Sequence, residues 1–264
     1  MEAYGRGKEL LLRTAKLNIA RGGVPVFWRE APEPYAAALV FRVGRADEAL
    51  AAAGITHLVE HLALPAQAMR PELDWNGWVG AVESGFWVSG EQTDALAFLQ
   101  DVAARVGDLP FDRLEIEKNI LRAEAANAPR GPVEVLAGIR FGAHGLGIVN
   151  WEEYGLYRLD ERSVADWARR YFGAGNAAVW MTSAPPRDFR LDLPDGPRMP
   201  PPASRPLDLP LPAFAKVGAG GVGISFLASR SWPLGAARAA PRRTPSQHDA
   251  AVRARHRLPG GRLE

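Results

Sequence analysis

The chain has 264 residues, 47% hydrophobic and 23% charged, which suffices for one substantial core or two small ones and excludes a wholly disordered protein. It contains no cysteine, so disulfides and thiolate metal sites are excluded and any metal must be held by His, Asp or Glu. No apolar run approaches the roughly 20 residues that cross a bilayer, and residues 1–23 lack the pattern of a signal peptide. We therefore expect a cytoplasmic protein with no membrane partner.

The net charge of +2 is unevenly distributed along the chain. Between Ser229 and Glu264 eight Arg stand against two acidic residues, so this tail carries +6 and residues 1–228 carry −4. An Arg-rich tail can contact nucleic acid, but Trp232 is its one aromatic residue and solvated basic ends are common. We predict no nucleic-acid partner.

Hydrophobic periodicity and turn residues predict a mixture of strands and helices without regular β-α alternation. The predicted elements in chain order are strands at 23–30 and 35–44, a helix at 54–64, a strand at 78–90, helices at 94–108 and 111–131, a loop at 141–155, a helix at 161–172 and a strand at 176–183. In the helix that follows Phe111, Asp112 is the predicted N-cap, with Glu115 three residues later. The irregular order favours an α+β fold, in which helices pack on a largely antiparallel sheet.

Four segments are predicted from the distribution of proline, glycine and charge. Residues 1–183 form the main domain, and the proline-rich residues 184–212 form a semi-rigid linker. Residues 213–228 begin another strand or hairpin, and the basic tail at 229–264 is expected to be poorly ordered.

Two histidines, His57 and His61, are four residues apart on the helix predicted at 54–64. On a helix, the ring nitrogens of residues i and i+4 can reach one ion, and Glu60 lies beside them on the same face. The apolar residues Ile55, Leu58, Val59 and Leu62 occupy the opposite face. The arrangement is typical of a metal site, and the alternative is a solvated polar face.

A catalytic zinc usually takes three protein ligands, so a third ligand is needed elsewhere. The next long helix places Glu117 and Glu124 on one stripe with Leu114, Ile120 and Leu121, while Lys118, Asn119 and Arg122 are predicted to point away. Acids within an apolar stripe are costly unless a cation or hydrogen bonds compensate them. A metal is one such cation, and salt bridges to neighbouring Arg or Lys are the alternative.

The sequence His57-Leu58-Val59-Glu60-His61 has the inverted zincin motif H-x-x-E-H, and the chain resembles the pitrilysin/insulinase family of zinc metallopeptidases, which includes the mitochondrial processing peptidases. The resemblance covers about residues 15–185. Five stretches carry it: NIARGGVPVFWRE, which resembles the family's opening strand pair, VGRADEALAAAGITHLVEHLAL, LEIEKNILRAEAA, FGAHGLG and ERSVADWARRYFGAGNAAVWMT.

The resemblance implies a zinc-dependent endopeptidase with Zn²⁺ held by His57, His61 and Glu124. It implies Glu60 as the general base and Glu117 as a supporting carboxylate of the catalytic site. The family binds a peptide as an added strand at a sheet edge, and WVGAVESGFWVSG resembles that region. Gly80 stands where the family usually has Asn, so one substrate contact differs.

Family members build an active chamber from two similar halves, and the second half contributes an Arg and a Tyr. The last tyrosine here is Tyr171, so we expect a first half only, truncated or altered in reading frame near Ser229. The expected partners are a peptide or unfolded polypeptide substrate and a second half-domain, either another chain or a second copy. The alternative function is that of a non-catalytic partner subunit.

Overall fold

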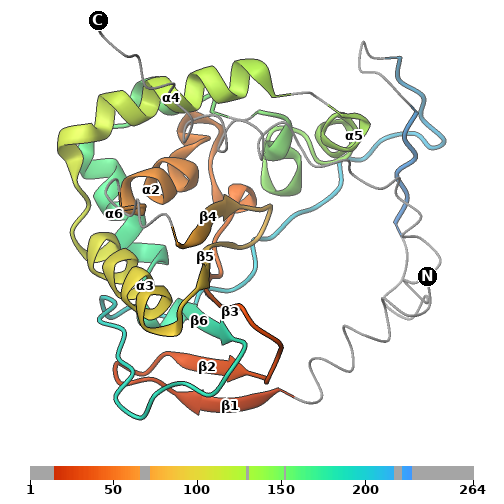
Figure 1. The fold of residues 1–264 in the computed structure, drawn as a ribbon. Helices are drawn as coiled ribbons and strands as arrows, with labels where there is room; N and C mark the ends of the chain where they lie inside the picture. Colours follow the sequence, from red (N-terminus) through yellow and green to blue (C-terminus); the bar gives the residue numbers. More distant parts are fainter. Residues whose placement is uncertain (1–14, 66–71, 129–130, 152, 217–221, 228–264) are drawn as a thin grey trace, which may run out of the picture. The chain divides into compact units, whose positions relative to one another are not determined.

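The computed structural model describes residues 15–65, 72–128, 131–151, 153–216 and 222–227. Those between 15 and 226 belong to one compact unit, whose ribbon is shown in Figure 1. Its strands are β1 (Lys16–Ile19), β2 (Pro25–Trp28), β3 (Tyr35–Phe41), β4 (Asp74–Val79), β5 (Ser84–Gly90) and β6 (Ala177–Met181). Its helices are α2 (Ile55–Ala63), α3 (Gln92–Gly107), α4 (Leu114–Asn127), α5 (Pro132–Phe141) and α6 (Glu161–Tyr171). The 3-10 turns η1 (Arg45–Asp47), η2 (Leu50–Ala52), η3 (Phe111–Arg113), η4 (Gly145–Asn150), η5 (Leu156–Arg158) and η6 (Ala174–Asn176) join them.

The described strands form one mixed sheet in the order β1-β2-β6-β3-β5-β4. β2 and β6 run parallel, and all the other neighbouring pairs run antiparallel. The prediction of an α+β fold with a largely antiparallel sheet is confirmed. β4 lies at one edge of the sheet and pairs with β5 alone among the described strands.

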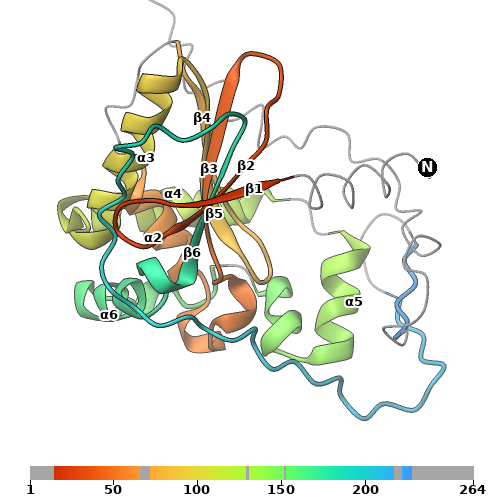
Figure 2. The same cartoon turned by 90° about the horizontal axis from the view of Figure 1, so that it is seen from below.

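One layer of helices covers the sheet. On β3, side chains at alternate positions are buried, as expected for a strand with one face on the core. Helix α3 packs on β3 and β5, and α2 packs on β4 and is flanked by α3, α4 and α6. Figure 2 shows α3 and α6 together on one side of the sheet, with α5 apart from them. The apolar stripe predicted for the motif helix is buried, so α2 is anchored on that face.

The region predicted as one strand at 78–90 is a hairpin. β4 ends at Val79, the backbone N–H of Gly80 donates to the carbonyl of Glu83 at 2.7 Å, and β5 begins at Ser84. Helix α5 was not predicted, although Pro132 at its first turn is a common helix start. Strand β1 agrees with the strand pair that the family resemblance implies.

Two details predicted for α4 are wrong. Asp112 is not its N-cap, because the chain enters through the η3 turn and the helix begins at Leu114 without a side-chain cap. Lys118 does not point away: it is 4% exposed, and its Nζ donates to Glu115 Oε1 at 2.6 Å. The flexible Lys stem lets the charged end reach an exposed carboxylate while the stem is buried.

The segment predicted as a linker has no helix or strand within residues 184–212. Phe189 and Leu191 are buried in the core, so the start of this segment packs on the domain. Residues 217–221 and the predicted tail at 229–264 lie outside the described residues, and the domain boundaries remain predictions. In the described ranges, no helix combines the length and apolarity needed to cross a bilayer.

Candidate metal centre

Buried Glu48 holds the start of the motif helix α2. Its two carboxylate oxygens accept hydrogen bonds from the backbone N–H groups of Gly54 at 2.9 Å and Thr56 at 3.0 Å. These N–H groups belong to the first turn, where no helical carbonyl is available. Burial raises the pKa of Glu48 to about 7, while the hydrogen bonds and the charge of Arg45 act in the opposite direction.

We expect Glu48 to make the stability of the zinc-free chain depend on pH. The folded chain keeps the Glu48 proton up to about pH 7, whereas the unfolded chain releases it near pH 4.5. The stabilisation is therefore present below pH 4.5 and is lost as the pH rises through 7, by roughly 2–3 kcal/mol between pH 5 and pH 8. Urea unfolding of wild type and Glu48→Gln at both pH values should show a fall in the free energy of unfolding that is smaller in the variant by this amount.

The exposed Glu72 offers a matched control for this measurement. Glu72→Gln should keep the pH dependence of the wild type. An equal fall in the free energy of unfolding for Glu48→Gln and wild type would contradict the role of Glu48.

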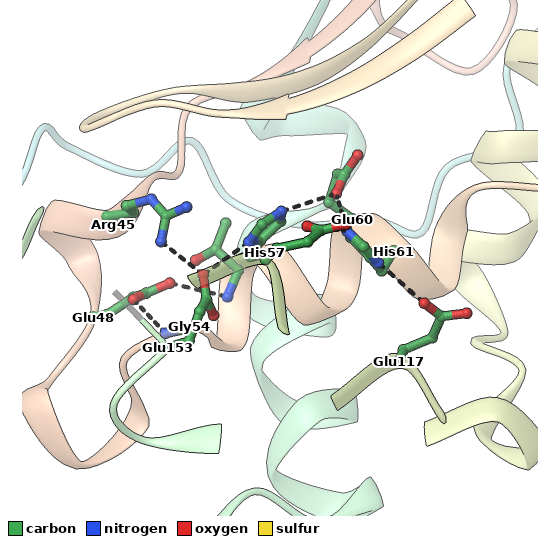
Figure 3. Close-up of polar contacts among 10 residues, drawn as sticks. Arg45, Glu48, Gly54, His57, Glu60, His61, Glu117 and Glu153 are labelled. Atoms are coloured by element: carbon green, nitrogen blue, oxygen red, sulfur yellow. Dashed lines mark hydrogen bonds and ion pairs between the residues drawn. The ribbon is translucent and has the colours of Figure 1, made fainter. Parts of the chain in front are cut away.

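The two histidines of α2 both direct their Nε2 atoms toward the Glu60 carboxylate, while their Nδ1 atoms contact other carboxylates. His57 Nδ1 is 2.8 Å from Glu153 Oε1, and His61 Nδ1 is 3.0 Å from Glu117 Oε2 (Figure 3). Because a carboxylate only accepts, each Nδ1 carries the hydrogen, and in the neutral ring Nε2 keeps its lone pair. The two Nε2 atoms lie 3.8 and 3.7 Å from the same atom, Glu60 Oε2.

Helix α4 adds two carboxylates to His61. Glu117 is buried, and besides its bond to His61 it accepts from Arg113 at 3.1 Å and 2.5 Å. Glu124, two turns later, has Oε2 3.7 Å from His61 Nε2. The predicted stripe therefore faces α2. The salt-bridge alternative holds for Glu117, which pairs with Arg113, and binding of a metal by these acids remains a prediction.

The donor atoms fit a metal such as zinc. Ligand atoms of His57, Glu60 and His61 lie within 4.8 Å of one another. Tetrahedral zinc with bonds of about 2.0–2.1 Å separates its ligand atoms by about 3.3 Å. Of the predicted ligands, His61 and Glu124 have donor atoms 3.7 Å apart, so this pair needs to move by a few tenths of an ångström. All five residues predicted from the sequence are thus close together, and their individual roles remain predictions.

Glycine in β4 makes room for the Glu60 carboxylate. A Cβ on Gly77 would lie 2.5 Å from Glu60 Cδ and 2.9 Å from its Cγ, well inside contact distance. The backbone of the edge strand and the buried side chain of Glu60 are therefore in direct contact. Only glycine permits so close an approach.

Glu153 belongs to this cluster and was not predicted. It lies 96 residues from His57 in the sequence, in the loop between η4 and η5, and Arg45 Nη1 donates to its Oε1 at 3.0 Å. Burial opposes its ionisation, but the hydrogen bond and charge of His57 and the charge of Arg45 lower the pKa of Glu153 to about 2. An acidic residue in a loop gives no sequence signal of such a contact.

The electrostatics of the cluster favour a cation. Burial lowers the pKa of His61, but its hydrogen bond to Glu117 and the nearby charges of Glu60 and Glu124 outweigh burial and raise this pKa above its usual value. For Glu117, burial raises the pKa, and the hydrogen bonds from His61 and Arg113 lower it overall. Buried carboxylates at this density are paired or bind metal ions.

No protein-family model matches the sequence, and a comparison with curated protein sequences finds no match. Solved structures do match the fold. A protease from Helicobacter pylori aligns with TM-score 0.57 and 14% identity over 74% of this chain and 54% of that one. An inactive domain of an M16 peptidase from Pseudomonas fluorescens aligns with TM-score 0.53 and 16% identity over 65% of this chain and 47% of that one. Pitrilysin aligns with TM-score 0.51 and 17% identity over 66% of this chain and 22% of its own.

The described domain therefore has the fold of the M16 peptidases, and the resemblance to the pitrilysin/insulinase family is confirmed at the level of the fold. The chain spans about half the length of the first of these structures and less than a quarter of pitrilysin. A chain that covers about half of the Helicobacter pylori protease is the size expected of one of two similar half-domains.

Proposed function

We propose that the chain is the first half-domain of a zinc-dependent endopeptidase. The observation that carries the proposal is the common orientation of the two histidines, whose Nε2 atoms both lie within 3.8 Å of Glu60 Oε2 while carboxylates hold their Nδ1 atoms. His57, His61 and Glu124 would hold Zn²⁺, with Glu117 supporting His61.

A zinc ion bound here would lower the pKa of a bound water to about 7 and polarise the peptide carbonyl. Glu60 acts as general base and then passes the proton to the leaving amine. The close packing of Gly77 against Glu60 limits the positions that this carboxylate can adopt. Glu117, paired with Arg113, keeps the His61 ring oriented.

The substrate is an extended peptide or an unfolded segment of polypeptide. β4 lies at a sheet edge and contacts Glu60 through Gly77, so a peptide added along β4 would run past the general base. Backbone hydrogen bonds to an edge strand do not select a sequence, which suits cleavage of varied peptides.

We propose that a second half-domain completes the site, supplied by another chain or by a second copy. The partial coverage of the M16 structures supports this. The alternative function is a non-catalytic partner subunit, and the likeness to a domain described as inactive favours it. The retained motif, with Glu60 between the two histidines, favours the enzyme.

Metal analysis and peptide hydrolysis test the proposal. The purified chain should contain about one zinc per molecule, and it should cleave an unfolded polypeptide once a second half-domain chain of the same fold is added. Zinc without cleavage under any pairing would favour the non-catalytic partner. A wild-type chain that takes up no zinc, even when zinc is supplied, would overturn the proposal.

A further inference from the structure

The loop between η4 and η5 reaches the metal centre at one residue. Glu153 has a side chain that is 4% exposed, and its Oε1 is shared by His57 Nδ1 at 2.8 Å and Arg45 Nη1 at 3.0 Å. Figure 3 shows the Glu153 carboxylate between Arg45 and the His57 ring. The contact mirrors that of Glu117 with His61, although the two acids come from different parts of the fold.

The backbone around Glu153 is held in an unusual conformation. Glu153 has φ of 59°, in the left-handed region that non-glycine residues rarely adopt. The N–H of Gly155 donates to the carbonyl of Ala53 at 2.9 Å, and a Cβ on Gly155 would lie 2.5 Å from Ala53 N. The carboxylate packs against Gly54, where a Cβ would overlap Glu153 Oε2. Strained residues persist where surrounding contacts fix them, and they concentrate at functional sites.

We infer that Glu153 is a positioning residue of the proposed zinc site. By accepting the Nδ1 hydrogen of His57 it fixes the ring as the tautomer whose Nε2 lone pair faces Glu60 and His61, and Arg45 keeps the carboxylate in place. The inference rests on the proposed function. It adds that each histidine has its own carboxylate and that the loop carrying Glu153 tunes metal affinity through His57.

Zinc affinity, measured by competition with a chromophoric chelator, tests the inference. Carboxylates that orient a ligating histidine typically account for 10–100-fold in metal affinity, so Glu153→Ala should bind zinc roughly 10–100-fold more weakly than wild type. Glu153→Gln keeps an acceptor oxygen but loses the charge-assisted bond, so its loss should be smaller. With Co²⁺ in place of zinc, the visible absorption of Glu153→Ala should differ from that of wild type, because His57 is no longer oriented.

Tyr157→Ala is the matched control, because Tyr157 is 65% exposed and follows the same loop. It should leave zinc affinity and the Co²⁺ spectrum unchanged. Wild-type affinity and spectrum in a folded Glu153→Ala variant would overturn the inference and leave the proposed function standing. If Glu153→Ala does not fold, Glu153→Gln decides, and unchanged affinity and spectrum there overturn the inference. Absence of zinc binding in wild type would overturn both.

Discussion

Replacing Glu60 by Gln should leave zinc bound and abolish most of the peptide cleavage. Gln has nearly the shape of Glu, so the contacts with Gly77 and with the two histidines can be kept. An amide cannot accept the proton of the attacking water, and general-base catalysis typically contributes about 10²–10⁴-fold. The measurement is kcat for an unfolded polypeptide with the second half-domain present, alongside the zinc content of both proteins.

Glu115→Gln provides the matched control for this experiment. Glu115 lies on α4, next to the helix that bears Glu60, and its side chain is 72% exposed. Cleavage by this variant should equal that of wild type. Equal cleavage by Glu60→Gln and wild type would refute the proposed role of Glu60, whereas loss of zinc from Glu60→Gln would make Glu60 a ligand instead.

The local part of the site was predictable because helical geometry fixes it. Spacings of three and four residues put His57, Glu60 and His61 on one face, and a spacing of seven put Glu117 and Glu124 on one face of the next helix. The buried stripe of α2 then orients that face toward α4. The burial of Lys118 escaped prediction because a helical wheel treats a long side chain as if it ended at Cβ.

Contacts between distant loops were not predictable from spacing. The bond between Glu153 and His57 depends on how the loop after η4 docks on residues 53–54, and no local pattern encodes that docking. The same holds for Glu48, whose carboxylate replaces an N-cap side chain that Gly54 cannot supply. In both cases an acidic residue of a loop accepts a hydrogen bond from α2 or its N-cap, and only the three-dimensional structure shows which residue does so.

Replacing Gly77 by Ala should lower cleavage by about 10²-fold while leaving the fold and the zinc in place, because a small misplacement of a catalytic group can cost that much. The added Cβ would overlap Glu60 Oε1, Cδ and Cγ, the outer atoms of a flexible side chain. The carboxylate can therefore rotate away from β4, and the expected cost in stability is that of mild overpacking, about 1–3 kcal/mol. The displaced Glu60 would no longer be held between the histidines. Cleavage, zinc content and thermal unfolding of the variant check this.

Gly107→Ala controls for the substitution itself, since a Cβ there would make only ordinary contact with Pro194 at 3.5 Å. Because β4 is also the proposed substrate strand, a double-mutant cycle with Glu60→Gln separates the two explanations. If Gly77→Ala acts by displacing Glu60, adding it to Glu60→Gln should reduce cleavage little further. Full additivity of the two losses would instead mean that Gly77 acts on peptide binding, and KM rather than kcat should then change.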